Sequence, residues 1–133
     1  MQYTHDHMIF TLMSMYPHLS HWKDYKVAMP CTEGGGQCGD PWIVEWTAPD
    51  TKPRAEWVLD HYHENQEAIC AALARHQRDD RLKYSDPFAF LPSDANEYVT
   101  ARHAAIIDYR SKLRDIEALP GWPLDVQFPD FPG

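Results

Sequence analysis

The stretch DYKVAMPCTEGGGQCGDPWIVEW, residues 24–46, indicates which kind of fold this chain adopts. Apolar residues occupy every second position in residues 24–29 and again in residues 42–46, which is the period of a half-buried β-strand. Between them, the three glycines at 34–36 tolerate the positive φ angles that a loose turn requires. The stretch therefore predicts a β-hairpin with a long tip.

The second strand of this hairpin is rich in tryptophan. Strict alternation places Trp42, Val44 and Trp46 on one face of the strand and Ile43 and Glu45 on the other. Exposed tryptophans are common in protein interfaces, so Trp42 and Trp46 are candidate partner-binding residues.

Helices are predicted on both sides of the hairpin. A short Met-rich helix over residues 8–15 should end before Pro17, because proline disfavours the helical conformation in the residue before it. A longer helix is predicted over 53–76, with Asp50 or Thr51 as its N-cap. Its apolar stripe contains Val58, Tyr62, Asn65, Ile69 and Leu73.

A second long helix should follow a connector at residues 78–94. Asp94 and Glu97 have the spacing of a capping box, and Pro120-Gly121 should end the helix. Residues at alternating spacings of three and four form a seam that favours a helical hairpin or a partner helix as its mate. The seam contains Val99, Arg102, Ile106, Tyr109, Leu113 and Ile116.

These elements predict an α+β protein that forms one compact domain. A short helix and a β-hairpin occupy residues 1–50, and a helical region occupies residues 51–119. An extended tail rich in proline and aromatic residues occupies residues 120–133.

The composition is that of an ordinary globular protein with an acidic surface. Hydrophobic residues make up 44% and charged residues 24% of the chain, and the formal net charge is -8. An acidic chain lacks the basic face that nucleic acids and anionic membranes require. The sequence also contains no apolar run of about 20 residues and no basic leader, so we expect a cytoplasmic protein.

The cysteines and histidines do not form a recognised catalytic or metal-binding pattern. Cys31 and Cys38 flank the glycine loop, where free thiols, a disulfide and half of a metal site all stay open. Cys70 lies in a helical context that predicts a buried thiol. The eight histidines do not complete a zinc-ligand set. We therefore expect no enzyme activity, no metal and no cofactor.

The C-terminal sequence DYRSKLRDIEALPGWPLDVQFPDFP, residues 108–132, resembles the C-terminal signature of phage tail assembly chaperones. That signature combines a Tyr-Arg-x-x-Leu-Arg-Asp-Ile helix end, a Pro-Gly-aromatic-Pro break and a Val-x-aromatic-Pro finish. The positions here are Tyr109, Arg110, Leu113, Arg114, Asp115, Ile116, Pro120, Gly121, Trp122, Pro123, Val126, Phe128 and Pro129.

The N-terminal half is similar to a second group, the small phage tail proteins of the XkdW type. These share a Tyr-Pro pair, an Asp-Tyr/Phe-x-Val motif, a Gly-rich loop, an Ile-x-x-Trp motif and a helix led by proline. The corresponding residues are Tyr16-Pro17, Asp24 to Val27, Gly34 to Gly36, Ile43 to Trp46 and Pro53.

The two resemblances imply a non-enzymatic assembly chaperone that binds and shields a phage tail-fibre or baseplate protein in the host cytoplasm. The alternative is a permanent structural adaptor in the virion tail fibre or baseplate. Homo-oligomerisation stays open. The expected partner-binding residues are Tyr109, Leu113, Trp122, Val126, Phe128, Phe131, Trp42 and Trp46.

Overall fold

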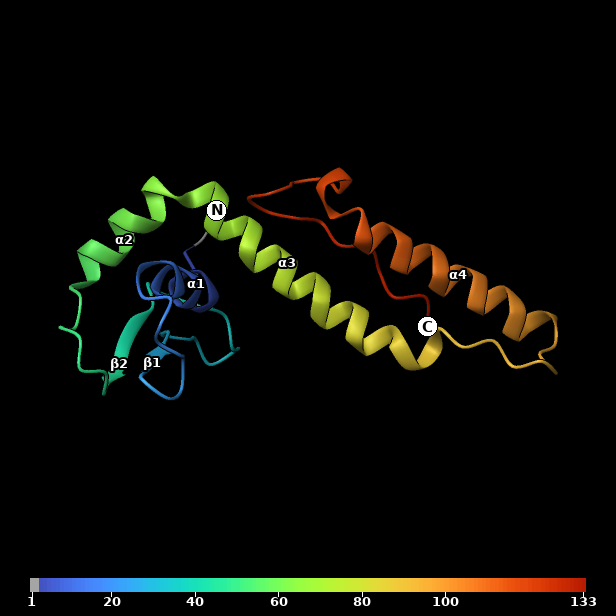
Figure 1. The fold of residues 1–133 in the computed structure, drawn as a ribbon, viewed down its shortest axis with the longest axis horizontal. Coiled ribbons are helices and arrows are strands. Elements are labelled where there is room, and N and C mark those ends of the chain that lie inside the picture. The colour runs from blue at the N-terminus through green and yellow to red at the C-terminus, as the bar shows by residue number, and fades with distance from the viewer. Residues whose placement is uncertain (1–2) are drawn as a thin grey trace. The chain divides into compact units, whose positions relative to one another are not determined.

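The computed structural model describes residues 3–133 and divides into two compact units (Figure 1). The first unit ends at Leu73, and the second runs from Ala74 to Gly133. Their boundary falls inside one long helix, α3 (Gln66–Ser85). The helices and the small sheet confirm the predicted α+β class. Within the described part of the chain, no helix is both long and apolar enough to cross a membrane.

Helix α1 (His5–Met15) begins earlier than the predicted residue 8, because Thr4 caps it. The Thr4 side chain accepts a hydrogen bond from the His7 N–H at 3.3 Å, and His7 Nδ1 accepts one from the Thr4 N–H at 3.0 Å. This reciprocal arrangement is a capping box in which histidine replaces the usual Glu or Gln. The helix ends at Met15, as the Tyr16-Pro17 pair predicts.

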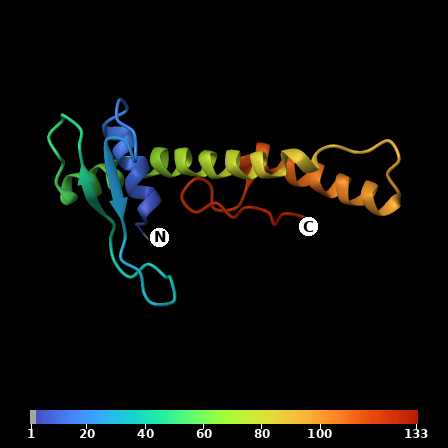
Figure 2. The ribbon, with the colours of Figure 1, turned by 90° about the horizontal axis from the view of Figure 1, so that it is seen from below.

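Strands β1 (Tyr25–Ala28) and β2 (Trp42–Trp46) form a two-stranded antiparallel sheet, which confirms the predicted hairpin (Figure 2). Lys26 lies opposite Glu45, and its ammonium group is 2.9 Å from the Glu45 carboxylate. Val27 lies opposite Ile43.

A β-bulge in β2 overrides the predicted alternation of its side chains. One residue, Val44, has no counterpart in the register, so the strand carries an extra residue between Ile43 and Glu45. Ile43 and Trp46 therefore both pack against the core although three positions separate them. The prediction that Trp42 and Trp46 share a face was wrong, because strict alternation does not continue through a bulge.

The first unit has two adjoining hydrophobic clusters. Side chains from α1, the hairpin and the next helix form the larger one, and a smaller one surrounds the start of α3. The larger contains Met8, Leu12, Leu19, Tyr25, Val27, Ile43 and Val58; the smaller contains Tyr62, Ile69 and Cys70.

The predicted helix over 53–76 is two helices, α2 (Ala55–Glu64) and α3. The break falls at Asn65, whose side-chain amide bonds the carbonyl of His61 at 3.0 Å and ends α2. The predicted N-caps, Asp50 and Thr51, were also wrong. The N-cap position belongs to Arg54, which makes no side-chain capping bond.

Helix α3 continues through the first part of the predicted connector and ends at Ser85. Residues 78–85 contain no glycine or proline and include several good helix formers, so nothing in them stops the helix. Pro87 then lies in a short 3₁₀ helix, η1 (Asp86–Phe88), which ends the helical path.

Helix α4 (Glu97–Arg114) starts with Asn96 as its N-cap, not with the predicted Asp94. The Asn96 side chain accepts a hydrogen bond from the Val99 N–H at 2.9 Å. Because Ala95 N–H bonds the Pro92 carbonyl, Asp94 lies in a turn before the helix. The apolar end of the predicted seam is confirmed, since Ile106, Tyr109, Leu113 and Ile116 are buried.

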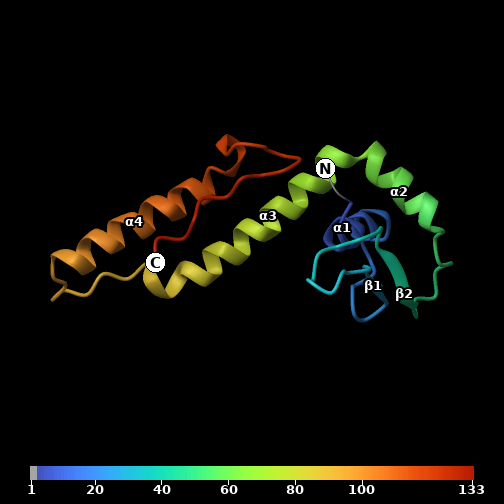
Figure 3. The same ribbon diagram turned by 180° about the vertical axis from the view of Figure 1, so that it is seen from behind.

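A buried arginine joins α4 to the end of α3. The Arg110 guanidinium donates to the Leu82 carbonyl at 2.9 Å and to the Ser85 hydroxyl, and it forms an ion pair with Asp86 at 2.9 Å. These bonds satisfy carbonyl and hydroxyl groups at a helix end that would otherwise lose their partners on burial. Figures 1 and 3 show α4 running back beside the later turns of α3.

The chain after α4 turns sharply before the tail. A short 3₁₀ helix, η2 (Ile116–Ala118), precedes Pro120, so the α-helix ends earlier than predicted. The Gln127 N–H bonds the Pro120 carbonyl at 2.8 Å, and the Asp125 N–H bonds the Gly121 carbonyl at 2.8 Å. Residues after this loop contain no helix or strand.

Gly121 is required by this loop. Its φ angle is +83°, and a Cβ there would lie 1.8 Å from the Asp125 carbonyl oxygen. Gly121→Ala should therefore destabilise the second unit by about 2–4 kcal/mol, from left-handed strain and the clash with backbone. Thermal unfolding followed by calorimetry measures this loss.

Gly34→Ala is the matched control for that substitution. Its Cβ would meet only the Thr32 hydroxyl at 3.9 Å, and its φ is not in the left-handed range. The control should leave the melting temperature nearly unchanged. Equal melting temperatures for both variants would contradict the assignment of Gly121 as a conformational requirement.

Candidate partner-binding surface

The three tail aromatics contact side chains of the second unit. Trp122 lies under the guanidinium of Arg75, 5.0 Å from the ring centroid, and Phe128 lies under that of Arg81 at 4.4 Å. Each contact is a cation–π interaction. In this conformation the rings of Trp122 and Phe128 are partly covered by the protein itself.

Phe131 fills a gap between three other rings. Its centroid is 5.3 Å from that of Tyr84, 5.4 Å from that of Phe88 and 5.5 Å from that of Tyr109. Edge-to-face contacts at these distances are favourable beyond the area they bury. The end of the tail is thus part of an aromatic cluster that includes the two helices of the unit.

The other predicted residues of the second unit are less accessible than a contact surface requires. Tyr109 is 4% exposed and Leu113 is fully buried, so a partner does not reach either side chain in this conformation. Val126 is half-buried in the loop after Gly121. Their role in partner binding stays a prediction.

In the first unit, the bulge separates the two tryptophans of β2. Trp46 is half-buried: its ring stacks on Tyr25 at 5.8 Å, and its Nε1–H donates to the Asp50 carbonyl at 2.7 Å. Trp42 is 44% exposed. Of the two, Trp42 is the one whose ring a partner can contact.

Besides Trp42, the first unit exposes Met13 and three more strongly exposed apolar side chains that were not predicted from the sequence. Trp57 is 50%, Val44 56% and Trp22 71% exposed. The position of Trp57 gave a signal, because it lies off the apolar stripe that contains Val58 and Tyr62. Trp22 gave none: its φ of +76° is a backbone conformation that sequence patterns do not reveal.

A hollow of about 650 Å³ opens beside Trp42, which is within the usual size of a ligand or side-chain pocket. Met8 of α1 and Ile43 of β2 are buried and form its floor, whereas Lys52 and Arg54, just before α2, are exposed and form its rim. We call it the β2–α2 hollow. Its lining residues are Met8, Trp42, Ile43, Lys52, Pro53, Arg54, Ala55 and Glu56.

The rim of the β2–α2 hollow carries two cations without carboxylate partners. Neither Lys52 nor Arg54 forms an ion pair with any described residue. The Arg54 guanidinium instead lies over the ring of Trp57, 5.3 Å from the centroid. A stacked guanidinium keeps its N–H edge available for an acceptor. Glu56 is the one acidic residue of the lining.

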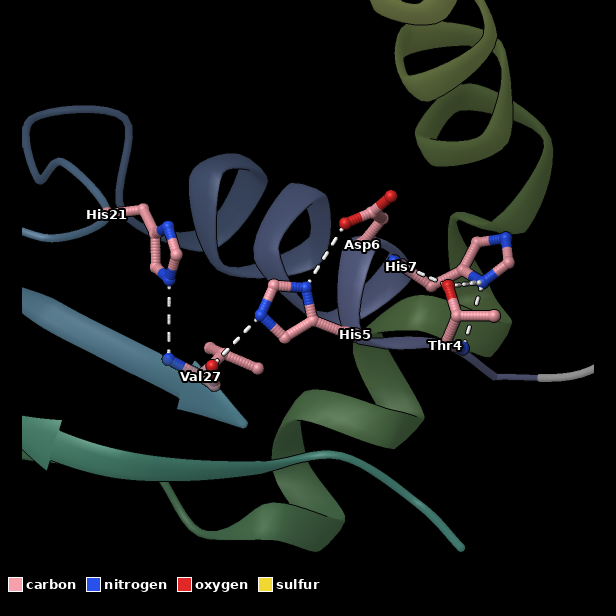
Figure 4. A network of polar contacts seen from close by, with 6 residues as sticks. All are labelled: Thr4, His5, Asp6, His7, His21 and Val27. Atoms are coloured by element: carbon pink, nitrogen blue, oxygen red, sulfur yellow. Dashed lines mark hydrogen bonds and ion pairs between the residues drawn. The ribbon is translucent and has the colours of Figure 1, made fainter. Parts of the chain in front are cut away.

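The outer edge of β1 is covered by two histidines (Figure 4). His5 Nε2 lies 2.9 Å from the Val27 carbonyl oxygen, so that nitrogen carries a proton. His21 Nε2 accepts a hydrogen bond from the Val27 N–H at 3.3 Å, so that nitrogen is unprotonated. The two rings contact each other edge-on, with centroids 5.8 Å apart. Both peptide groups that Val27 directs away from β2 are therefore occupied.

Burial lowers the pKa of two histidines in this region below the ordinary 6.5. For His21, burial is the main cause and the neighbouring His5 adds to it, while Asp6 opposes both. For His7, burial lowers the pKa and Asp6 opposes it. Both rings use an unprotonated nitrogen to accept a backbone N–H, so protonation removes that hydrogen bond.

The described residues contain three free thiols and no cluster of potential metal ligands. All three cysteines are free; Cys31 and Cys38 are exposed and Cys70 is buried. Burial raises the pKa of the Cys70 thiol, which keeps it protonated. Among residues 3–133, no three His, Cys, Asp or Glu side chains lie close enough together to hold a metal ion.

A comparison with known families finds a match within the first unit. Residues 8–70 match the model of a family described as XkdW protein. The match supports a phage-related family. It covers most of the first unit, including both strands and the whole β2–α2 hollow. No curated protein and no solved structure matches the chain.

The lowered pKa values predict that acid destabilises the first unit. A histidine with a lowered folded pKa contributes stability above the unfolded value of 6.5, and that contribution is lost as the pH falls through the folded pKa. Replacing His7 and His21 by Gln keeps an acceptor but removes the titration. Chemical unfolding at a series of pH values should show a smaller acid loss for this variant, by about 1 kcal/mol per hydrogen bond.

His76→Gln is the control, because His76 lies exposed in the second unit. It should leave the pH dependence of the first unit unchanged. If the double variant loses as much stability in acid as the unmodified chain, the two histidines are not the groups responsible.

The aromatic cluster predicts that Phe131 stabilises the second unit. Phe131→Ala removes ring contacts with Tyr84, Phe88 and Tyr109 and should cost about 1–3 kcal/mol, because the site is only half-buried. Calorimetry of the full chain measures the loss. Tyr98→Ala, which truncates an exposed ring on α4, is the control and should cost little. A Phe131→Ala variant as stable as this control would show that the tail is not held by its terminal ring.

Proposed function

We propose that this protein is a non-enzymatic phage tail or tail-fibre assembly protein that binds and shields a tail, fibre or baseplate protein. The observation that carries the proposal is the XkdW match over residues 8–70, which falls on a unit with exposed tryptophans beside an open hollow. Assembly takes place in the host cytoplasm in this proposal.

The surface of the first unit supports a binding role. A partner-binding surface combines exposed aromatic side chains with a concave site that one of its anchors can enter. Trp42 lines the hollow, and Trp57 lies beside its rim through the contact with Arg54. Monomeric proteins expose few large apolar groups together, so this grouping favours a contact surface over a solvated one.

In this conformation the tail aromatics pack against the protein's own second unit, which favours a stabilising role for the tail over partner binding. The resemblance of residues 108–132 to tail assembly chaperones led to an expectation of partner contacts there. The rings of Trp122, Phe128 and Phe131 instead contact Arg75, Arg81 and the aromatic cluster. The proposal therefore places the first contact with the partner on the first unit.

The test is co-expression with the tail, tail-fibre and baseplate proteins of the same genome. A stable complex on size-exclusion chromatography, together with a larger soluble fraction of the fibre protein, is the expected result. The double variant Trp42→Ala/Trp57→Ala should reduce complex formation at least tenfold, since truncating an aromatic anchor commonly costs 2 kcal/mol or more, about a thirtyfold loss. Tyr98→Ala removes a more exposed ring from the second unit and should have no effect.

The absence of a complex with every tail, fibre and baseplate protein would overturn the proposal. If a complex forms, mass spectrometry of purified particles distinguishes a transient chaperone from a permanent adaptor. A chain missing from the mature particle acts as a chaperone, and a chain present at a fixed copy number is a permanent adaptor.

A further inference from the structure

We propose that the β2–α2 hollow binds an extended acidic segment of the partner, with one large apolar side chain in the hollow and carboxylates at Lys52 and Arg54. This inference rests on the proposed function and specifies the chemistry of the partner at that site.

The structure disfavours pairing of a partner strand with β1. A two-stranded sheet has two outer edges, and either one offers backbone groups to an incoming strand. At β1, His5 and His21 already occupy the carbonyl and the N–H of Val27. A strand added there would have to displace two hydrogen bonds, so the accessible side of the sheet is β2.

The bulge argues against a regular ladder along β2 as well. β2 spans Trp42–Trp46, and the bulge at Val44 lies in the middle of it. A bulge bends the strand and interrupts the spacing of its outward peptide groups. Recognition on this side must therefore come from side chains, which the hollow and its rim provide.

The positive charges of the rim favour a negatively charged partner segment. The chain has a formal net charge of -8, yet two unpaired cations stand at the mouth of an apolar hollow. The Glu56 carboxylate offsets only part of that charge. Stacking on Trp57 restrains the Arg54 guanidinium, which lowers the entropy lost when it binds a carboxylate. A basic segment would meet Lys52 and Arg54 as like charges, which disfavours it.

The apolar part of the hollow selects the anchor. Trp42, Ile43, Pro53 and Met8 supply aromatic and aliphatic surface, and the volume of about 650 Å³ is ample for one large side chain. Ile43 and Met8 belong to the larger hydrophobic cluster, so the floor of the hollow is fixed before binding. A preformed floor favours an apolar side chain that needs no rearrangement of the core.

Two blocked synthetic peptides test the inference on the full-length chain. Both carry a central Leu; in one, Asp alternates with Ser on each side of it, and in the other, Lys replaces each Asp. Titration with isotope-labelled protein, followed by two-dimensional NMR, should show binding of the acidic peptide with shifts at Trp42 and Ala55. Lys52→Glu/Arg54→Glu should weaken it about tenfold or more, and added salt should weaken it in the unmodified protein.

Lys83→Glu is the control, because it introduces one charge reversal of the same kind at an exposed site of the second unit. It should bind the acidic peptide as the unmodified chain does. Equal binding of the two peptides, shifts confined to other residues, or no binding of the acidic peptide at millimolar concentration would each overturn the inference.

The co-expression experiment keeps this test separate from that of the proposed function. A fibre protein that binds Lys52→Glu/Arg54→Glu as tightly as the unmodified chain would remove the inference about the hollow and leave the assembly role standing. The lack of any tail, fibre or baseplate complex would remove the assembly role whatever the peptides do.

Discussion

The single extra residue in β2 decides how the first unit is built. Because Val44 is bulged, Ile43 and Trp46 can both reach the core from a strand of five residues. Without the bulge, one of these two side chains would face solvent, and the larger cluster would lose the packing contacts of that side chain. The same displacement leaves Trp42 exposed at the mouth of the β2–α2 hollow. One local irregularity thus builds the core and the candidate binding surface together.

The second unit depends on a different kind of constraint, a buried cation. Arg110 lies on the face of α4 turned toward α3 and bonds a carbonyl, a hydroxyl and a carboxylate at the end of that helix. Three oriented acceptors fix the position of α4 more narrowly than apolar contacts do, since hydrogen bonds are directional and hydrophobic burial is not. With α4 held in this position, Tyr109 has a fixed place against which the Phe131 ring packs.

The sequence predicted most elements of the fold but not their irregularities. The hairpin, the end of α1 at Met15 and the buried seam through Leu113 follow from periodicity and proline placement. The bulge at Val44 and the helix break at Asn65 do not follow from periodicity. Val44 is left out of the strand register and the Asn65 side chain bonds the His61 carbonyl, and no sequence pattern signals either event. Capping was similarly missed at Thr4, where histidine performs the part usually given to Glu or Gln.

The candidate surface was harder to predict than the fold. Trp42 was singled out from its residue type, but the hollow joins residues from α1, β2 and the start of α2 that no spacing in the sequence connects. For the tail aromatics, the residues were singled out from the sequence but their role was not determined by it. Their composition is equally compatible with an interface and with an intramolecular cluster, and only the positions of Arg75, Arg81 and Tyr84 distinguish the two.

The histidines on Val27 have a consequence for copies of the chain that meet one another. A short sheet with two open edges is a template for stacking identical molecules strand against strand, the route by which small β-hairpins form fibrils. At Val27, His5 and His21 take the place of a third strand, since they bond its outward carbonyl and N–H without adding any chain. Two copies that meet at β1 would therefore have to break both hydrogen bonds before their strands could pair.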